Sequence, residues 1–232
     1  MINKLSYFLL IVGLLFAALR YQEMGELDCA SAGERAQVSV RLDMPDPELN
    51  TDLSYAQITQ KFRSYHGGQA ASPYLQALGV TEFFMDVQFQ LKFLEKMKSF
   101  TGQACLIPEK VDVVLILKQT IFLGQSSTRS KCQFKTLMDH EMRHVTINRD
   151  ITQKNLKKFE ESVRVGIANY GQYQGWGPYE LQRSSDKKEK LKAYMDSSIK
   201  RVAKETENEI NRLQSKVDTP GEYMRIGRAC RW

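Results

Sequence analysis

Residues 133–151 read QFKTLMDHEMRHVTINRDI, and they have the period of an amphipathic helix. At about 100° per residue, their apolar side chains fall on two neighbouring stripes of such a helix. His140 and His144 lie on the second stripe, and Glu141 lies between the two. The first stripe is Phe134, Met138, Met142 and Val145, and the second adds Leu137, Ile147 and Ile151 to the two histidines. Both imidazoles are therefore expected to point inward among apolar side chains, where they need a partner such as a metal.

Residues 140–144 read HEMRH, which matches the pattern HExxH. Histidines four residues apart lie on one face of a helix, so both rings can reach one zinc ion. The glutamate between them can take a proton from a water whose pKa zinc lowers to about 7. The pattern predicts that His140 and His144 bind zinc and that Glu141 is the general base of a hydrolase. The alternative is a pair of core histidines satisfied by ordinary hydrogen bonds, with Glu141 on the helix surface.

The helix is expected to continue well beyond the motif. Later apolar residues extend the first stripe without a change of phase, namely Leu156, Phe159, Val163 and Ile167. This predicts one helix that runs to about Tyr170. In such a helix Asp150, Glu160 and Glu161 face away from the histidine pair. A third zinc ligand is therefore expected from another element.

A second long amphipathic helix is predicted from Leu191 to Val217. Glu209 falls on its apolar stripe, where a carboxylate usually meets a cation. We therefore predict Glu209 as the third zinc ligand, and an ion pair with a lysine or arginine is the equal alternative. His66, in a glycine-rich loop, is a further candidate ligand.

Three stretches ahead of the motif have the patterns of β-strands. Residues 37–43 alternate and end before a proline-rich turn, and residues 86–93 alternate between polar and apolar side chains. Residues 111–117 are apolar without alternation, which indicates a strand covered on both faces. These features predict an α+β fold, in which a small mixed sheet packs on the HExxH helix and a long C-terminal helix follows. One domain is expected over residues 36–232.

The first twenty residues have the composition of an export segment. Residues 1–4 are positively charged, and residues 5–19 are almost continuously apolar. This run is short for a membrane span and typical of the apolar part of a signal peptide. The acidic flank that follows favours export of the rest of the chain. A cleaved signal peptide and a retained membrane anchor over residues 1–20 both remain open, with a linker over residues 21–35.

The four cysteines agree with export. Cys29, Cys105, Cys132 and Cys230 are even in number and have no CxxC spacing, so two disulfides in an oxidising compartment are expected. Three pairings are possible. We expect Cys105 to pair with Cys132, which would close the strand region, and Cys29 to pair with Cys230, which would tie the two ends.

At HEMRH the chain resembles the zincin metallopeptidases. More widely, it is similar to a bacterial family of predicted secreted zinc-dependent proteases that is classed as a domain of unknown function. The similarity covers roughly residues 37–170, and it rests on the segments LSYAQITQKF and VDVVLIL, on Cys105 and Cys132, and on HExxH in a helix without a glycine turn. The resemblance implies a zincin-like fold and peptidase activity. It also implies zinc binding by His140 and His144 and a base at Glu141, but a further downstream histidine of that family has no counterpart here.

The sequence therefore predicts an exported bacterial Zn²⁺-dependent metalloprotease, in the periplasm, at the membrane or outside the cell. Its expected partners are a peptide or protein substrate and, if the N-terminal segment is retained, the membrane. The net charge of +6 is spread thinly and no basic run is interleaved with aromatic residues, which argues against nucleic acid. One alternative is a non-enzymatic, membrane-anchored envelope protein that keeps the fold. Another is an interaction module whose long C-terminal helices bind a partner.

Overall fold

The computed structural model describes residues 11–15, 29, 36–65, 76–98 and 101–230. The chain forms two compact units. The first unit contains Met1–Val38, Gln90–Val111 and Val163–Asp196, and the second contains Ser39–Phe89, Asp112–Ser162 and Ser197–Trp232. Three strands and two helices have residues in both units.

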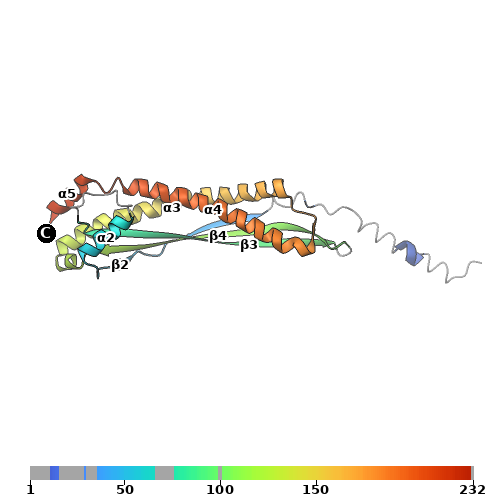
Figure 1. Ribbon diagram of the computed structural model, residues 1–232, viewed down its shortest axis with the longest axis horizontal. Coiled ribbons are helices and arrows are strands. Elements are labelled where there is room, and N and C mark those ends of the chain that lie inside the picture. Colours follow the sequence, from blue (N-terminus) through green and yellow to red (C-terminus); the bar gives the residue numbers. More distant parts are fainter. Residues whose placement is uncertain (1–10, 16–28, 30–35, 66–75, 99–100, 231–232) are drawn as a thin grey trace, which may run out of the picture. The chain divides into compact units, whose positions relative to one another are not determined.

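The strands form one mixed sheet around β4 (Gln103–Leu123), as Figure 1 shows. Within the described residues, β4 pairs with β1 (Gln37–Asp43), β2 (Glu48–Asn50), β3 (Gly79–Lys98) and β5 (Tyr179–Glu180). The β2 strand is parallel to β4 and places Leu49 opposite Ile121, whereas β5 is antiparallel. A mixed sheet with long helices confirms the expected α+β class.

The two long strands extend the predicted ones at both ends. Along β3, residues 87–94 alternate between half-buried and exposed side chains, which confirms the alternation seen in the sequence. The expectation for residues 111–117 was wrong in one respect. In β4, residues 111, 113, 115 and 117 are buried and the residues between them are only partly buried, so one face of this strand is fully covered and the other is not.

The second unit has two apolar clusters beneath its helices. Helix α2 (Tyr55–Tyr65) is capped by Ser54, whose hydroxyl accepts from the Gln57 amide at 3.4 Å. Its fully buried Ile58 packs with Phe62 and with Val80 of β3. The second cluster joins the end of β4 to two later helices and contains Ile121, Leu123, Leu137, Val145 and Ile226.

Three helices follow the sheet, namely α3 (Lys131–Gln174), α4 (Ser184–Gln214) and α5 (Pro220–Ala229), with short 3₁₀ turns at Gln125–Arg129 and Leu181–Arg183. Helix α3 passes through the HExxH motif and beyond Tyr170 without a break, as predicted. Helix α4 confirms the second long helix but ends before Val217.

In the second unit, α3 and α4 lie side by side and run antiparallel (Figure 1). Hydrogen bonds join Ser162 to Ser198, Asn155 to Glu209, and Gln214 to Asn148. The earlier a residue lies in α3, the later its partner lies in α4, as expected of antiparallel helices.

The first unit packs around one tryptophan. Trp176 is 5% exposed, and its carbonyl accepts a hydrogen bond from the Leu106 amide at 3.0 Å. The Tyr170 ring lies 5.7 Å from the Trp176 ring. Gly177 has a φ of +118°, and a Cβ at this position would lie 2.7 Å from the Ala104 carbonyl oxygen. Glycine is therefore required where this loop meets β4.

Two disulfides join the cysteines, but not in the expected pairs. Cys29 bonds to Cys105 in the first unit, and Cys132 bonds to Cys230 in the second. The expectation that Cys105 pairs with Cys132 was wrong because the strand between them is much longer than predicted. Cys105 lies near the beginning of β4 and Cys132 follows its end, so the strand separates the two residues.

Most of the predicted export segment at residues 1–20, and nearly all of the linker at residues 21–35, lie outside the described residues. Residues 11–15 are helical. Across the part of the chain that the structure describes, none of the helices combines the length and the apolar character needed to cross a bilayer.

Candidate metal centre

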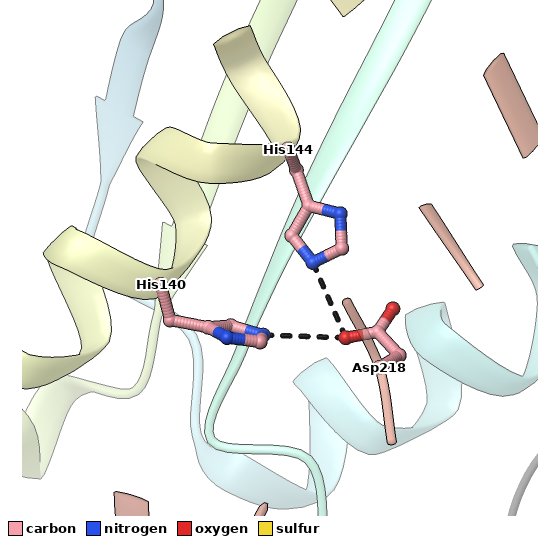
Figure 2. Close-up of side chains that lie close together, drawn as sticks. All are labelled: His140, His144 and Asp218. Atoms are coloured by element: carbon pink, nitrogen blue, oxygen red, sulfur yellow. Dashed lines mark hydrogen bonds and ion pairs between the residues drawn. The ribbon is translucent and has the colours of Figure 1, made fainter. Parts of the chain in front are cut away.

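His140 and His144 project from one face of α3 toward the same carboxylate oxygen (Figure 2). The Nε2 atoms of both rings lie 3.2 Å from Oδ1 of Asp218. Both histidines are buried, with 4% and 5% of their surface exposed. The HExxH helix therefore presents its two imidazoles as the periodicity predicted, and the third side chain comes from the turn after α4.

The three side chains together could hold a metal ion. Their ligand atoms all lie within 4.8 Å of one another. Tetrahedral zinc, with metal–ligand distances of about 2.0–2.1 Å, holds its ligand atoms about 3.3 Å apart. Two nitrogens and one carboxylate oxygen leave a fourth position for water or substrate, as in catalytic zinc sites. Within residues 11–15, 29, 36–65, 76–98 and 101–230, no other group of three histidine, cysteine, aspartate or glutamate side chains meets this spacing.

The charges around the centre favour a cation there. Burial by itself raises the pKa of Asp218, but the hydrogen bonds from His140 and His144 outweigh burial and hold the pKa of this carboxyl well below its usual range. Burial lowers the pKa of His140, but Asp218 and the nearby Glu141 more than offset it and raise the pKa. Asp218 therefore stays ionised, and its negative charge can be balanced by a protonated histidine or by a bound metal ion.

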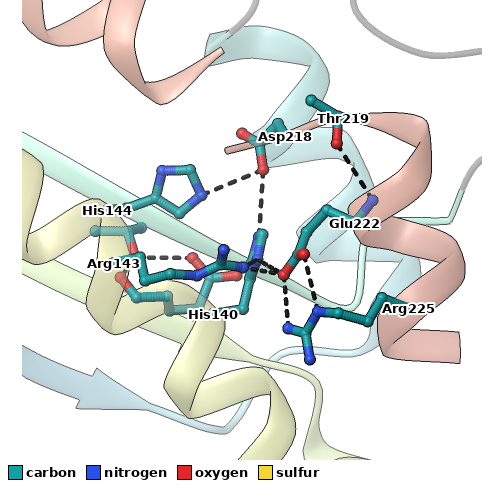
Figure 3. Close-up of polar contacts among 9 residues, drawn as sticks. His140, Arg143, His144, Asp218, Thr219, Glu222 and Arg225 are labelled. Atoms are coloured by element: carbon teal, nitrogen blue, oxygen red, sulfur yellow. Dashed lines mark hydrogen bonds and ion pairs between the residues drawn. The ribbon is translucent and has the colours of Figure 1, made fainter. Parts of the chain in front are cut away.

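A second carboxylate lies on the far side of the His140 ring (Figure 3). Glu222 of α5 has Oε1 3.3 Å from His140 Nδ1. Arg225 donates to Glu222 at 2.7 and 2.9 Å, and Arg143 also contacts this carboxylate. The hydrogen bond from Arg225 is the largest cause that lowers the pKa of Glu222, to about 2. Nη2 of Arg143, which can only donate, lies closer to the same Nδ1 atom, at 2.8 Å, so His140 Nδ1 has both a donor and an acceptor beside it.

Glu141 is held by the first residues of β3. Its side chain is almost fully buried, at 2% exposure, and the Thr81 hydroxyl donates to Oε2 at 2.8 Å. A Cβ at Gly79 would lie 2.5 Å from Glu141 Oε1, so a larger residue at this position would displace the Glu141 carboxylate. Burial raises the pKa of Glu141, although His144 and His140 partly oppose this. A carboxylate with a raised pKa is a stronger proton acceptor than an exposed one.

A cavity of about 130 Å³ adjoins this group. His140, Glu141, His144 and Asp218 line it, together with Tyr223. Burial raises the pKa of the Tyr223 phenol, and the charge of Asp218 raises it further, so the hydroxyl stays protonated and hydrogen bonds to Asp218. The rest of the lining contains the apolar Phe62, Leu78, Val80, Leu137 and Ile226, the glycines Gly79 and Gly227, and the polar Gln76, Thr81 and Gln214.

A buried pair of side-chain amides joins the end of α4 to α3. Gln214 Nε2 donates to Asn148 Oδ1 at 2.5 Å, and Asn148 donates to Gln119 of β4 at 2.8 Å. Asn148 lies one helical turn after His144, and Gln214 lies one turn before Asp218. Buried polar pairs of this kind fix the register of neighbouring helices. The pair therefore places Asp218 at the level of the histidines.

The helix that carries Glu222 and Tyr223 is fastened at both ends. Thr219 caps α5 and accepts a hydrogen bond from the Glu222 amide at 3.2 Å. After the helix, Cys230 forms a disulfide with Cys132 in the first turn of α3. The disulfide therefore ties α5 to the same helix that carries the two histidines.

The structure places Glu209, the expected third ligand, away from the histidines. Its carboxylate accepts from Lys154 and from Asn155, both at 3.1 Å. The hydrogen bond from Asn155, followed by that from Lys154, lowers the pKa of Glu209. This is the ion-pair alternative drawn from the sequence, and Asp218 stands beside the histidines instead. His66 lies outside the described residues.

Asp218 was missed because the second helix was expected to end near it, with no reason to bring it back to the motif. One signal was available. The predicted helical stretches from His144 to Tyr170 and from Leu191 to Val217 have the same length, so two antiparallel helices would return Val217, next to Asp218, to the level of His144. Glu222 and Tyr223 carried no such signal, since α5 was not predicted.

Comparisons with protein-family models, with curated proteins and with solved structures found no match to this chain.

Proposed function

We propose that this chain is a zinc-dependent hydrolase of peptide bonds, built on a zincin-like HExxH helix. The observation that carries the proposal is the convergence of His140, His144 and Asp218 at the spacing of zinc ligands, with Glu141 buried beside them. Ordinary core histidines would need hydrogen-bond partners, but they would not need a glutamate at the middle of the motif in a cavity that they share.

His140, His144 and Asp218 would hold the zinc ion. When bound, zinc polarises a carbonyl oxygen and makes a nearby water more acidic. Glu141 accepts the proton of the attacking water, because its raised pKa makes it a better base than an exposed glutamate. Thr81 holds Oε2 of that carboxylate, so Oε1 is the oxygen available to the proton. Glu141 then passes the proton to the amine that leaves.

Glu222 and Arg143 support the ligands. With a metal bound, His140 Nδ1 would carry the proton and donate it to Glu222, which would direct Nε2 toward the centre, and Arg143 Nη2 would have to move away from Nδ1. Arg143, whose side chain is 45% exposed, contacts the Glu222 carboxylate. This proposal includes a zincin-like fold and a relationship to the predicted secreted zinc-dependent proteases.

Two disulfides are consistent with an oxidising environment. We propose that the chain is exported to the bacterial periplasm or beyond, either as a released or as a membrane-anchored protein. Peptides or unfolded proteins in that compartment would be the substrates.

The test is Glu141→Gln. We expect this variant to keep the wild-type zinc content and fold, and to lose peptide hydrolysis by about a hundredfold or more, since only the base is changed. Zinc content is measured by mass spectrometry and hydrolysis with a mixed peptide library. A variant that hydrolyses the library at the wild-type rate would overturn the role of Glu141, and a zinc-loaded wild type without hydrolysis would favour the non-enzymatic envelope protein.

A further inference from the structure

The two disulfides differ in how easily a reagent can reach them. In the first unit, Cys29 and Cys105 are only 4% and 0% exposed. In the second, Cys132 is exposed and its partner Cys230 is 8% exposed. A thiolate that opens a disulfide must reach one of its sulfur atoms. Of the four cysteines, Cys132 is the one that such a thiolate reaches most easily.

The charges in the sequence around the two bonds also differ. Exposed basic residues lie within three positions of Cys132 or Cys230, namely Arg129, Lys131 and Arg228. No aspartate or glutamate lies within three positions of either cysteine. By contrast, Glu26 and Asp28 lie within three positions of Cys29. Positive charge raises the local concentration of thiolates, so it favours attack on the Cys132–Cys230 bond.

Both thiolates that opening this bond would produce have a stabilising group nearby. Thr136 Oγ1 lies 3.4 Å from Cys230 Sγ. A disulfide sulfur can only accept, so the hydroxyl is the donor, and it can donate equally to a Cys230 thiolate. Cys132 lies in the first turn of α3, where the unpaired amides and the positive end of the helix dipole stabilise a thiolate.

The bond joins the two helices on which the candidate metal centre depends. Helix α3 carries His140 and His144, and α5 carries Glu222, whose carboxylate faces the His140 ring (Figure 3). Once the bond opens, only noncovalent contacts hold the end of α5 against α3. Losing the partner of a metal-binding histidine lowers metal affinity by about 10–100-fold. Opening this bond is therefore expected to weaken the centre.

We propose that Cys132–Cys230 is a thiol–disulfide exchange site, at which a dithiol reductant opens the bond and lowers the zinc affinity of the centre. A thiolate of the dithiol bonds to Cys132 Sγ and expels Cys230 as a thiolate. The second thiolate of the dithiol then attacks the first sulfur, which breaks the mixed disulfide and releases Cys132 as a thiolate. The dithiol becomes a disulfide, and its two electrons and two protons pass to the two cysteines.

The inference rests on the proposed function, because its consequence is a change in zinc binding. It adds regulation to that function. The chain would bind zinc tightly only where the disulfide forms, so it would be inactive in a reducing compartment and active after export.

The first test measures which bond opens. The folded full chain is treated with dithiothreitol, free thiols are blocked with iodoacetamide at successive times, and peptide mass spectrometry locates them. We expect the Cys132–Cys230 bond to open at least about tenfold faster than the Cys29–Cys105 bond. Equal rates, or faster opening of Cys29–Cys105, would overturn the proposed exchange site.

The second test measures what opening does. Dithiothreitol binds zinc, so zinc affinity is measured with a competing dye after the thiols are blocked and the reductant is removed. We expect the opened protein to bind zinc at least about tenfold more weakly than protein treated with iodoacetamide alone. Cys132→Ser/Cys230→Ser, which carries no blocking group, should match the opened protein. Full zinc affinity in both would overturn the switch and leave the proposed function intact.

A threonine pair on α3 provides matched variants. Thr136→Val removes the hydroxyl beside Cys230 and keeps the size of the side chain, so it should slow opening about fivefold, the equivalent of one hydrogen bond. Thr146→Val removes a hydroxyl that donates to the Met142 carbonyl in the same helix, and it should leave the opening rate unchanged. Equal rates in the two variants would contradict the role of Thr136 in releasing Cys230.

The outcomes separate the switch from the proposed function. An oxidised wild type that takes up no zinc would end the proposed function and the switch with it. An oxidised wild type that binds zinc, with an opened form that binds it as tightly, would end only the switch.

Discussion

The two units of this chain have different interiors. Every buried polar or charged side chain in the described residues belongs to the second unit, including His140, Glu141, His144, Asn148 and Gln214. The buried residues of the first unit are apolar or aromatic and surround Trp176 and a disulfide. A polar interior costs stability unless each group finds a partner. The candidate metal centre therefore lies in the unit that has the polar interior.

The disulfides give the largest expected effect and the clearest contrast between the units. Removing either bond, with Cys29→Ser/Cys105→Ser or with Cys132→Ser/Cys230→Ser, should lower the free energy of unfolding by about 2–5 kcal/mol. Only the second change should also weaken zinc binding, because that bond ties α5 and Glu222 to the HExxH helix. Urea unfolding and competition with a zinc-binding dye measure the two quantities. Equal loss of zinc affinity in both variants would break the contrast.

The hydrogen bond between Asn148 and Gln214 allows a test of whether the polar interior positions α4 against α3 or only stabilises the fold. Asn148→Leu alone should lower the free energy of unfolding by about 1–3 kcal/mol, since it leaves Gln214 and Gln119 buried without their partner. Asn148→Leu with Gln214→Leu should recover part of that loss. We expect zinc affinity to stay low in the double variant, because the buried hydrogen bond that fixes this end of α4 beside α3 is then lost. Recovery of zinc affinity along with stability would show that the pair has no part in positioning.

Glu209 provides the smallest effect and a control within the second unit. Glu209→Gln should lower the free energy of unfolding by about 1 kcal/mol or less at neutral pH, because Lys154 is largely exposed. The pKa of Glu209 is lowered from its ordinary 4.5, so the ion pair stabilises the fold above that value and is lost as the pH falls through the lowered pKa. Urea unfolding of both proteins between neutral and acid pH measures this, and a difference that grows toward low pH would contradict it.

The local features of the molecule could be predicted from the sequence. The apolar period around HEMRH gave the continuous helix α3 and the inward direction of both histidines, because helical spacing alone determines which side chains share a face. Alternation gave the face of β3 that packs inward, and the order of strands before helices gave the α+β class.

Features that depend on which distant segments of the chain come into contact could not be predicted in the same way. Glu209 lies on the apolar stripe of α4, but the periodicity of α4 does not determine which residue of α3 lies opposite Glu209. That level is set by the Asn148–Gln214 pair, and it brings Asp218 to the histidines. The cysteine pairing failed for a related reason, since the length of β4 decides which cysteines meet.

The proposed metal centre depends most directly on Asp218 as its third ligand. Zinc content per chain, measured by mass spectrometry after dialysis against zinc and then against metal-free buffer, tests it on the wild type, Asp218→Ala, His140→Ala and Glu209→Ala. We predict about one zinc per chain in the wild type and in Glu209→Ala, and loss of zinc in Asp218→Ala and His140→Ala. Full zinc content in Asp218→Ala, or a folded wild type that takes up none, would contradict the account.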